Sequence, residues 1–362
     1  MAKRVKKRRK IFKFLAFLIV MGVSAGIGLC IYCVSPITKD SEKVSFNVEA
    51  GSSTTKIVNE LKKDNLIRSR KFALLFIKIN NIDTIKAGQY DLDRNMGLRE
   101  IFSIITDTKH IKHDSITITF PEGKNMRGIV KIITENTKIT ENDIYNTLND
   151  KEYLKSLMEE YWFLSDSILD SRIYYSLEGY LYPDTYEFDK DVDIKGIFKK
   201  MLDREEEILD KYKTTIDSSN TTVHKVLTMA SIAELEGKTL EDRKNIIGVF
   251  YNRLNNHLPL GSDVTTYYAA KVDMGERDLY QAEIDQHNNY NTRPMSSAGY
   301  IPIGPISNPS DSAINAAINY TKNDYFYFVA DKNGKVYFSK TDAEHVATIQ
   351  KLKKEGLWFN YE

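Results

Sequence analysis

Two glutamates in the segment TMASIAELEG, Glu234 and Glu236, are the side chains best suited to acid–base chemistry. At 100° per residue, residues 223–236 predict a helix with Glu234 on the same face as Val223, Leu227 and Ala230. Glu236 falls roughly 160° away and is predicted to be exposed. Burial disfavours the charged form of a carboxyl and raises its pKa, which suits a general acid. The pattern therefore makes Glu234, rather than Glu236, the candidate for a reactive acid.

The same pattern also fits two structural roles for Glu234, a salt bridge or a side chain turned outward at the helix end. Its surroundings favour a site. Gly237 can end the helix, and Thr239–Asp242 resembles a capping box that starts the next one. A cleft can open at such a tight corner, and the polar loop 287–309 can supply donors to a polyhydroxylated ligand.

Other chemistries have weaker support in the sequence. Zincin, nucleophile-elbow, phosphate-loop and dinucleotide-binding motifs are absent. His110 and His113 lie among lysines and indicate a solvated surface rather than a zinc site. Cys30 and Cys33 have C-x-x-C spacing but lie within an apolar run, which disfavours a redox or metal site. No metal and no cofactor are predicted.

The N-terminus predicts a membrane anchor. Eight lysines and arginines crowd residues 1–13, and about 22 uncharged residues follow at 14–35, enough to cross a bilayer. The basic head predicts a cytoplasmic N-terminus and an extracytoplasmic body. A cleaved signal peptide is the alternative, but the apolar run is longer than is usual for one. Without the basic head the chain is acidic overall, so nucleic acid is not an expected partner.

A polar linker is predicted at 36–44, and a small domain at 45–110. The expected order is a strand near 44–48, helices within 53–80, a strand at 85–93 and a further helix. The stretches VEAGSSTTKIVNELKKDNLI and IKAGQYDL resemble a LysM-like domain, which implies glycan binding. A spacer domain without a ligand is an equally open interpretation.

Residues 115–362 predict a larger α+β domain, because helical segments and antiparallel strands are segregated along the chain. Helices are expected at 222–236, 240–255, 310–321 and 341–354, and a hairpin is expected to turn at Asn333-Gly334. Residues 174–189 hold five tyrosines, which fit either a sugar-stacking cleft or, more simply, a loop packed in the core.

Seven ordered motifs resemble the YceG-like family of endolytic murein transglycosylases. They are LEGYLYPDTYEF, LTMASIAELEG, NIIGVFYNRL, LGSDVTTYYA, YNTR, IPIGPISNPS and YFYFVAD. The resemblance covers roughly residues 45–354. It implies that Glu234, the first glutamate of the A-S-I-x-E motif, is catalytic, and it implies site positions at Glu178, Asp184, Asp263, Tyr290, Asn291 and Thr292.

The sequence departs from the family pattern in three places. Val264 replaces a proline in the T-D-P-T motif, Ile303 replaces a proline in L-P-P-G, and Arg293 replaces an aromatic residue after Y-N-T. These changes affect the expected loop shape and glycan preference but leave the acid in place.

The resemblance implies cleavage of the β-1,4 bond between N-acetylmuramic acid and N-acetylglucosamine in nascent peptidoglycan, with a 1,6-anhydro product. Hydrolysis normally uses two carboxylates, whereas this lytic reaction needs one. The implied partners are peptidoglycan strands, the lipid bilayer and cell wall synthases.

Two rival functions stay open on the sequence. One is an inactive peptidoglycan-binding scaffold, and the other is a hydrolytic muramidase with Asp263 as its second carboxylate. Glu236 is predicted to be dispensable for activity.

Overall fold

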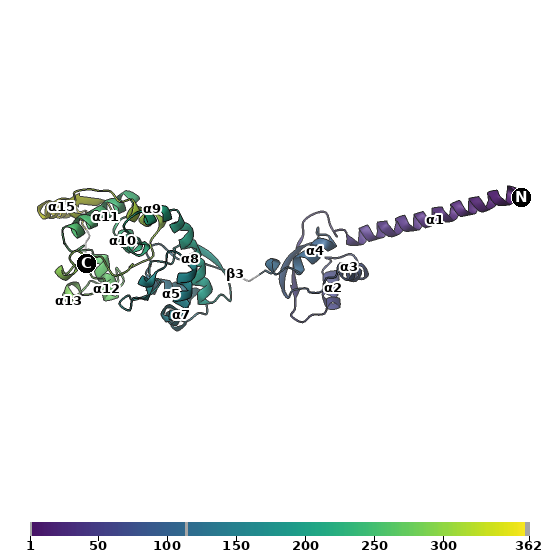
Figure 1. The fold of residues 1–362 in the computed structure, drawn as a ribbon, viewed down its shortest axis with the longest axis horizontal. Coiled ribbons are helices and arrows are strands. Elements are labelled where there is room, and N and C mark those ends of the chain that lie inside the picture. Colours follow the sequence, from purple (N-terminus) through teal and green to yellow (C-terminus); the bar gives the residue numbers. More distant parts are fainter. Residues whose placement is uncertain (1, 113–114, 359–362) are drawn as a thin grey trace. The chain divides into compact units, whose positions relative to one another are not determined.

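The computed structural model describes residues 2–112 and 115–358, and His113 of the H-x-x-H pair lies outside this part. The chain divides into two compact units, unit 1 (Met1–Asp114) and unit 2 (Ser115–Glu362) (Figure 1). Each unit has its own hydrophobic core. We therefore describe the two units separately.

Helix α1 (Ala2–Val34) contains the predicted anchor. Its segment Phe17–Val34 is long and apolar enough to cross a membrane and is 6% buried within the protein. A signal sequence near the N-terminus satisfies the same criteria of length and apolar composition.

The residues that follow α1 are fixed to unit 1, although 36–44 were predicted to form a polar linker. Arg68 donates hydrogen bonds to the carbonyls of Pro36 and Ile37. The amides of Ile37 and Thr38 donate to the Arg94 carbonyl at 2.9 and 3.1 Å. Residues 39–43 are exposed, whereas residues 36–38 are partly buried and held by these hydrogen bonds, and the linker stays a prediction.

Unit 1 pairs two antiparallel strands, β1 (Lys43–Val48) and β2 (Gly88–Asp93), in the predicted order of elements. The helices of this unit are α2 (Thr54–Lys63), α3 (Arg70–Ile79), α4 (Leu98–Ile105) and the short η1 (Thr108–His110). Ser53 and Ser69 cap α2 and α3 by accepting backbone N–H groups. The likeness to LysM modules and any glycan binding stay predictions.

Unit 2 begins with β3 (Ser115–Thr119), which pairs antiparallel with β4 (Thr185–Asp189) about seventy residues later. The helices of this part are α5 (Met126–Asn136), α6 (Glu141–Asn149), α7 (Lys151–Glu160), η2 (Asp166–Leu169), α8 (Ile194–Asp210) and α9 (Lys213–Ser218). Figure 1 shows α5, α7 and α8 on the same side of β3. Tyr180, Tyr182 and Tyr186 are buried, so these tyrosines pack the core rather than stack on sugars.

Helix α10 (Val223–Glu236) is surrounded by other elements, and every residue from Val226 to Ala233 is buried. It packs against α11 (Leu240–Asn255), α12 (Asp263–Ala270) and α14 (Asp311–Ile318). A helix buried on all sides has no solvent-facing stripe. The predicted helix is confirmed, but the single packed face inferred from its periodicity is wrong.

The remaining elements complete the predicted α+β class. Strands β5 (Tyr327–Ala330) and β6 (Val336–Ser339) form the predicted hairpin, with Gly334 at φ +85°. The other elements are α13 (Gln281–Asp285), η3 (Met295–Ser297) and α15 (Asp342–Lys354).

Candidate active site

The carboxylate of Glu234 is held at both oxygens near the end of α10. Arg243 Nη2 lies 2.5 Å from Oε1, and the amide and hydroxyl of Ser310 donate to Oε2 at 3.0 and 2.5 Å. The exposed side-chain fractions are 6% for Glu234 and 9% for Arg243. Burial of Glu234 is confirmed, and it comes with the salt bridge that the sequence had left as a structural alternative.

The corner between α10 and α11 brings Arg243 to this carboxylate. A Cβ at Gly237 would lie 3.0 Å from Arg243 Cγ, so glycine allows the arginine to fold back over the corner. Arg243 Nε also donates to the Gly237 carbonyl at 3.0 Å. The tight turn predicted from the sequence therefore places the Arg243 guanidinium at the end of α10.

The loop after Ile303 is fixed to the same helix one turn earlier. The amide of Ile306 donates to Ser231 Oγ at 3.0 Å, and Ser307 Oγ donates to the Ser231 carbonyl at 3.2 Å. These bonds place Ser310, the N-cap residue of α14, against Glu234. Hydrogen bonds thus join two motifs that lie far apart in the sequence, the end of α10 and the segment before α14.

Glu122 is a second carboxyl beside Glu234, and the sequence analysis missed it. A Cβ at the next residue, Gly123 (φ +74°), would lie 3.5 Å from Glu234 Cγ. Gly123 also donates its amide to the Asn308 carbonyl at 2.9 Å, which fixes the turn. Glu122 is exposed, and partial desolvation together with the neighbouring Glu234 raises its pKa, while Arg243 opposes the shift. The Pro-Glu-Gly turn after a strand was the available signal.

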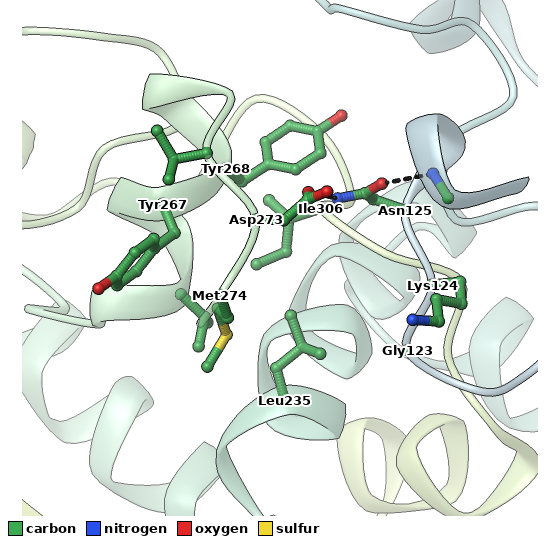
Figure 2. A pocket seen from close by; sticks show the side chains of 12 residues that line it. Gly123, Lys124, Asn125, Leu235, Tyr267, Tyr268, Asp273, Met274 and Ile306 are labelled. Atoms are coloured by element: carbon green, nitrogen blue, oxygen red, sulfur yellow. Dashed lines mark hydrogen bonds between the residues drawn. The ribbon is translucent and has the colours of Figure 1, made fainter. Parts of the chain in front are cut away.

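A pocket of about 240 Å³ opens next to Glu122 and Glu234, and the residues that follow them, Gly123 and Leu235, line it. Figure 2 shows Leu235 of α10, Tyr267 and Tyr268 of α12, and Lys124 and Asn125 of the loop after β3 around the same space. Apolar side chains and polar groups share the lining, which is typical of sites that bind small or sugar-like ligands.

A polar bridge connects two walls of the pocket. Asp273 accepts hydrogen bonds from Arg127 Nη2 at 2.6 Å and from Asn125 Nδ2 at 3.4 Å. Met274 follows it and is 57% exposed. The bridge ties the start of α5 to the loop after α12.

Glu178 is buried behind the pocket wall, with 2% of its surface exposed. Its Oε2 accepts from the Met126 amide and the Tyr268 hydroxyl, both at 2.9 Å, and its Oε1 accepts from Asn308 Nδ2 at 3.3 Å. Burial raises the pKa of Glu178 to about 7, against the lowering effect of these donors and of Arg127. Glu178 thus contacts the walls of the pocket rather than its open space.

Asp184 is joined through its backbone to the segment before Glu122, because its carbonyl accepts from the Phe120 amide at 2.9 Å. Its carboxylate accepts from Arg204 Nε of α8 at 3.2 Å and from the Thr185 amide at 2.8 Å, at the start of β4. No hydrogen bond within the described chain connects it to Glu234 or Glu178. The Asp184 side chain therefore has other partners than Glu234 and Glu178 have, and its place in the site stays a prediction.

Glu236 is half-buried, so the prediction of an ordinary exposed acid is wrong. Ser262 Oγ donates to its Oε1 at 2.6 Å, and burial raises its pKa against the effects of Ser262 and Arg293. The projection assumed one open side of α10, but the start of α12 covers this side.

Asp263 is exposed at the first turn of α12 and forms an ion pair with Arg293. The arginine that departs from the family pattern therefore pairs with the acid that had been the predicted second carboxylate. The pKa of Glu122 is the one that Glu234 raises.

The predicted site residues Tyr290, Asn291 and Thr292 are all buried. Tyr290 accepts a hydrogen bond from the Tyr174 amide at 3.1 Å through its hydroxyl. Asn291 donates to three backbone carbonyls, the closest at 2.8 Å. Thr292 Oγ1 lies 2.7 Å from Thr265 Oγ1. These side chains bond within the protein and support the corner next to Glu236.

Metal ligation has no geometric support among residues 2–112 and 115–358. No three His, Cys, Asp or Glu side chains in this part of the chain are grouped so that they could hold an ion.

Comparisons with known proteins extend across both units. Residues 46–351 match the YceG-like family. An endolytic murein transglycosylase of Bacillus subtilis is 35% identical over 315 residues, with 86% of each chain covered. One from Streptococcus pneumoniae is 32% identical over 355 residues, which are 92% of this chain and 63% of that relative.

A solved structure agrees with these matches. The structure of a yceG-like protein from Listeria monocytogenes has a TM-score of 0.60 and 34% sequence identity. It covers 85% of this chain and 100% of that chain.

Proposed function

The chain belongs to the YceG-like family, and from this premise we propose that it is a lytic transglycosylase that cleaves peptidoglycan glycan strands. The observation that carries the proposal is the buried Glu234 carboxylate, fixed by Arg243 and Ser310 beside the pocket. Both curated relatives described above are named endolytic murein transglycosylases.

In the proposed reaction, a proton passes from Glu234 to the leaving glycosidic oxygen and the bond to the anomeric carbon of N-acetylmuramic acid breaks. The 6-hydroxyl of the same sugar attacks that carbon, and its proton returns to Glu234. One product strand carries a 1,6-anhydro end and the other a free hydroxyl. No water is consumed, and no cofactor takes part.

The residues around Glu234 have separate proposed roles. Arg243 and Ser310 fix the carboxylate so that it is pre-organised for proton transfer. Glu122 is a second carboxyl near this group, and its pKa is raised by partial desolvation and by the charge of Glu234.

The remaining predicted site residues act indirectly in this proposal. Glu178 positions the pocket walls, and Tyr290, Asn291 and Thr292 support the loop that carries Asp263. The mixed pocket next to Glu234 receives a sugar of the strand. Helix α1 anchors the enzyme in the membrane with its body outside the cytoplasm, where the strands and the synthases that make them are found.

The test is a digestion of purified glycan strands with the soluble ectodomain, residues 40–362, followed by mass measurement of the products. Ends lighter by one water are expected. Glu234→Gln should lower the rate roughly a hundredfold or more, because it cannot donate the proton. Glu241→Gln, which changes an exposed acid in the first turn of α11, is the matched control and should leave the rate unchanged.

Hydrolysis is the second function to be distinguished, because Glu122 supplies the second carboxyl that a muramidase uses. Reducing ends in place of anhydro ends would establish hydrolysis. A complete absence of products with both the unaltered ectodomain and the variants would leave the scaffold as the function.

A further inference from the structure

The end of α1 is fixed to unit 1 by one arginine. Arg68 Nη2 and Nε donate to the Pro36 carbonyl at 2.5 and 3.1 Å. Its Nη1 donates to the Tyr32 hydroxyl at 3.1 Å, and its guanidinium lies 4.5 Å from the centre of the Tyr32 ring. Because Tyr32 is in the last turn of α1, Arg68 holds the end of the apolar helix against the rest of unit 1.

Helix α3 follows Arg68 closely and exposes apolar side chains. Leu75 is 50% exposed and Ile79 is 68% exposed, while Ala73 and Ile77 on the other face are buried. Among the described residues of unit 1 beyond α1, Leu75 and Ile79 are the large hydrophobic side chains that are exposed. They are four residues apart, so they lie one above the other on the helix surface.

The same helix is basic. Arg70, Lys71 and Lys78 are exposed, and the sequence of α3, RKFALLFIKI, contains no acid. A helix with apolar side chains on one face and lysine or arginine beside them is typical of segments that lie at a membrane surface. Basic side chains at that depth are attracted to anionic headgroups.

The position of α3 agrees with this chemistry. It contacts α1, and Figure 1 shows it next to the end of α1 where the chain enters unit 1. If α1 crosses a bilayer as proposed, α3 is therefore held close to that bilayer's surface.

We propose that α3 docks on the bilayer that α1 crosses, with Leu75 and Ile79 entering the interface and Arg70, Lys71 and Lys78 facing anionic headgroups. The inference rests on the proposed anchor. It makes unit 1 a membrane-surface platform, whether or not unit 1 also binds glycan. A protein partner is the alternative occupant of this face.

The test uses the full chain, reconstituted in vesicles of phosphatidylcholine with or without phosphatidylglycerol. After Cys30→Ala and Cys33→Ala, single cysteines at Ile79, Ser24 and Thr108 are labelled with an environment-sensitive fluorophore. Ser24 lies within α1 and reports the anchor, while Thr108 is exposed in η1 and is the matched control within unit 1.

At position 79 we expect a blue-shifted emission that spin-labelled lipids quench, with a stronger effect when phosphatidylglycerol is present. At position 108 we expect the emission of a fluorophore in water, without quenching by spin-labelled lipids. Lys71→Glu with Lys78→Glu should abolish the phosphatidylglycerol effect at position 79.

Water-like emission at position 79 together with quenching at position 24 would overturn the inference and leave the anchor intact. A shift at position 79 that lipid probes do not quench would assign this face to a protein partner and overturn the inference too. Water-like emission at position 24 would instead refute the anchor, and with it the premise.

Discussion

At the scale of single residues, Glu178 is a buried acid whose partners belong to three walls of the pocket. The Met126 amide begins α5, the Tyr268 hydroxyl comes from α12, and Asn308 belongs to the loop that carries Ser310. An ionised carboxylate accepts from all three donors, whereas a protonated one gives up part of that capacity. The protonation state of Glu178 therefore affects how firmly the walls are joined.

The raised pKa of Glu178 predicts a pH dependence of stability. Its pKa shifts from 4.5 to about 7 on folding, so between these values the folded state binds more protons than the unfolded state. The stabilising contribution is fully present below pH 4.5 and is lost as the pH rises through 7. At 1.36 kcal/mol per pKa unit, the loss is about 3 kcal/mol at most.

Glu178→Gln removes this titration. The decrease in the free energy of unfolding between pH 5 and pH 8, measured by urea denaturation, should be smaller in the variant than in the unaltered protein by up to about 3 kcal/mol. An equal decrease in both proteins would show that Glu178 does not change its protonation state over this range.

At the scale of elements, the start of α14 has two functions. Ser310 Oγ accepts from the Ala313 amide at 3.3 Å and so caps the helix, and it also donates to Glu234. Capping by serine is common, but here the same hydroxyl orients the proposed acid. A change at Ser310 should therefore affect both the stability of the protein and the proposed activity.

Ser310→Ala should lower stability by about 1 kcal/mol through the lost cap. It should also lower kcat about tenfold or more, because the hydrogen bond that orients the Glu234 carboxyl is lost. Thr341→Ala is the matched control, since Thr341 caps α15 through its bond to the Glu344 amide. It should show the same loss in thermal denaturation with unchanged kcat. Equal activity of the two variants would remove Ser310 from the site.

At the scale of the whole molecule, the proposed chemistry lies within unit 2. The hydrophobic core of this unit is built from residues between Ile118 and Val336. Unit 2 also contains the proposed site residues Glu122, Glu234, Arg243 and Ser310. Unit 1 has a separate core built around residues such as Phe46, Leu61 and Tyr90. Each unit therefore contains the buried apolar surface that it needs to fold.

A chain of residues 115–362 should fold alone and cleave soluble glycan strands at a rate within about twofold of the ectodomain, a difference of less than 1 kcal/mol. Circular dichroism through a thermal transition reports folding, and product masses report activity. A folded but inactive fragment would show that unit 1 takes part in the reaction.

Local signals in the sequence were sufficient to predict several helices and one hairpin. Periodicity and caps predicted α10, α11 and α15, and the Asn333-Gly334 turn predicted the β5–β6 hairpin. These features depend on neighbours within a few residues, so a single sequence contains them. The buried acid Glu234 was predicted for the same reason, because its apolar neighbours repeat along one helix.

The sequence by itself thus determined the elements, the apolar helix α1 and the choice of Glu234. Only the tertiary structure decided what surrounds that acid. It added Arg243, Ser310 and Glu122, half-buried Glu236 against the start of α12, and paired the Asp184 carboxylate with Arg204. The physical reason is that these contacts join segments up to 112 residues from Glu234, and helical periodicity does not record which element packs against each face.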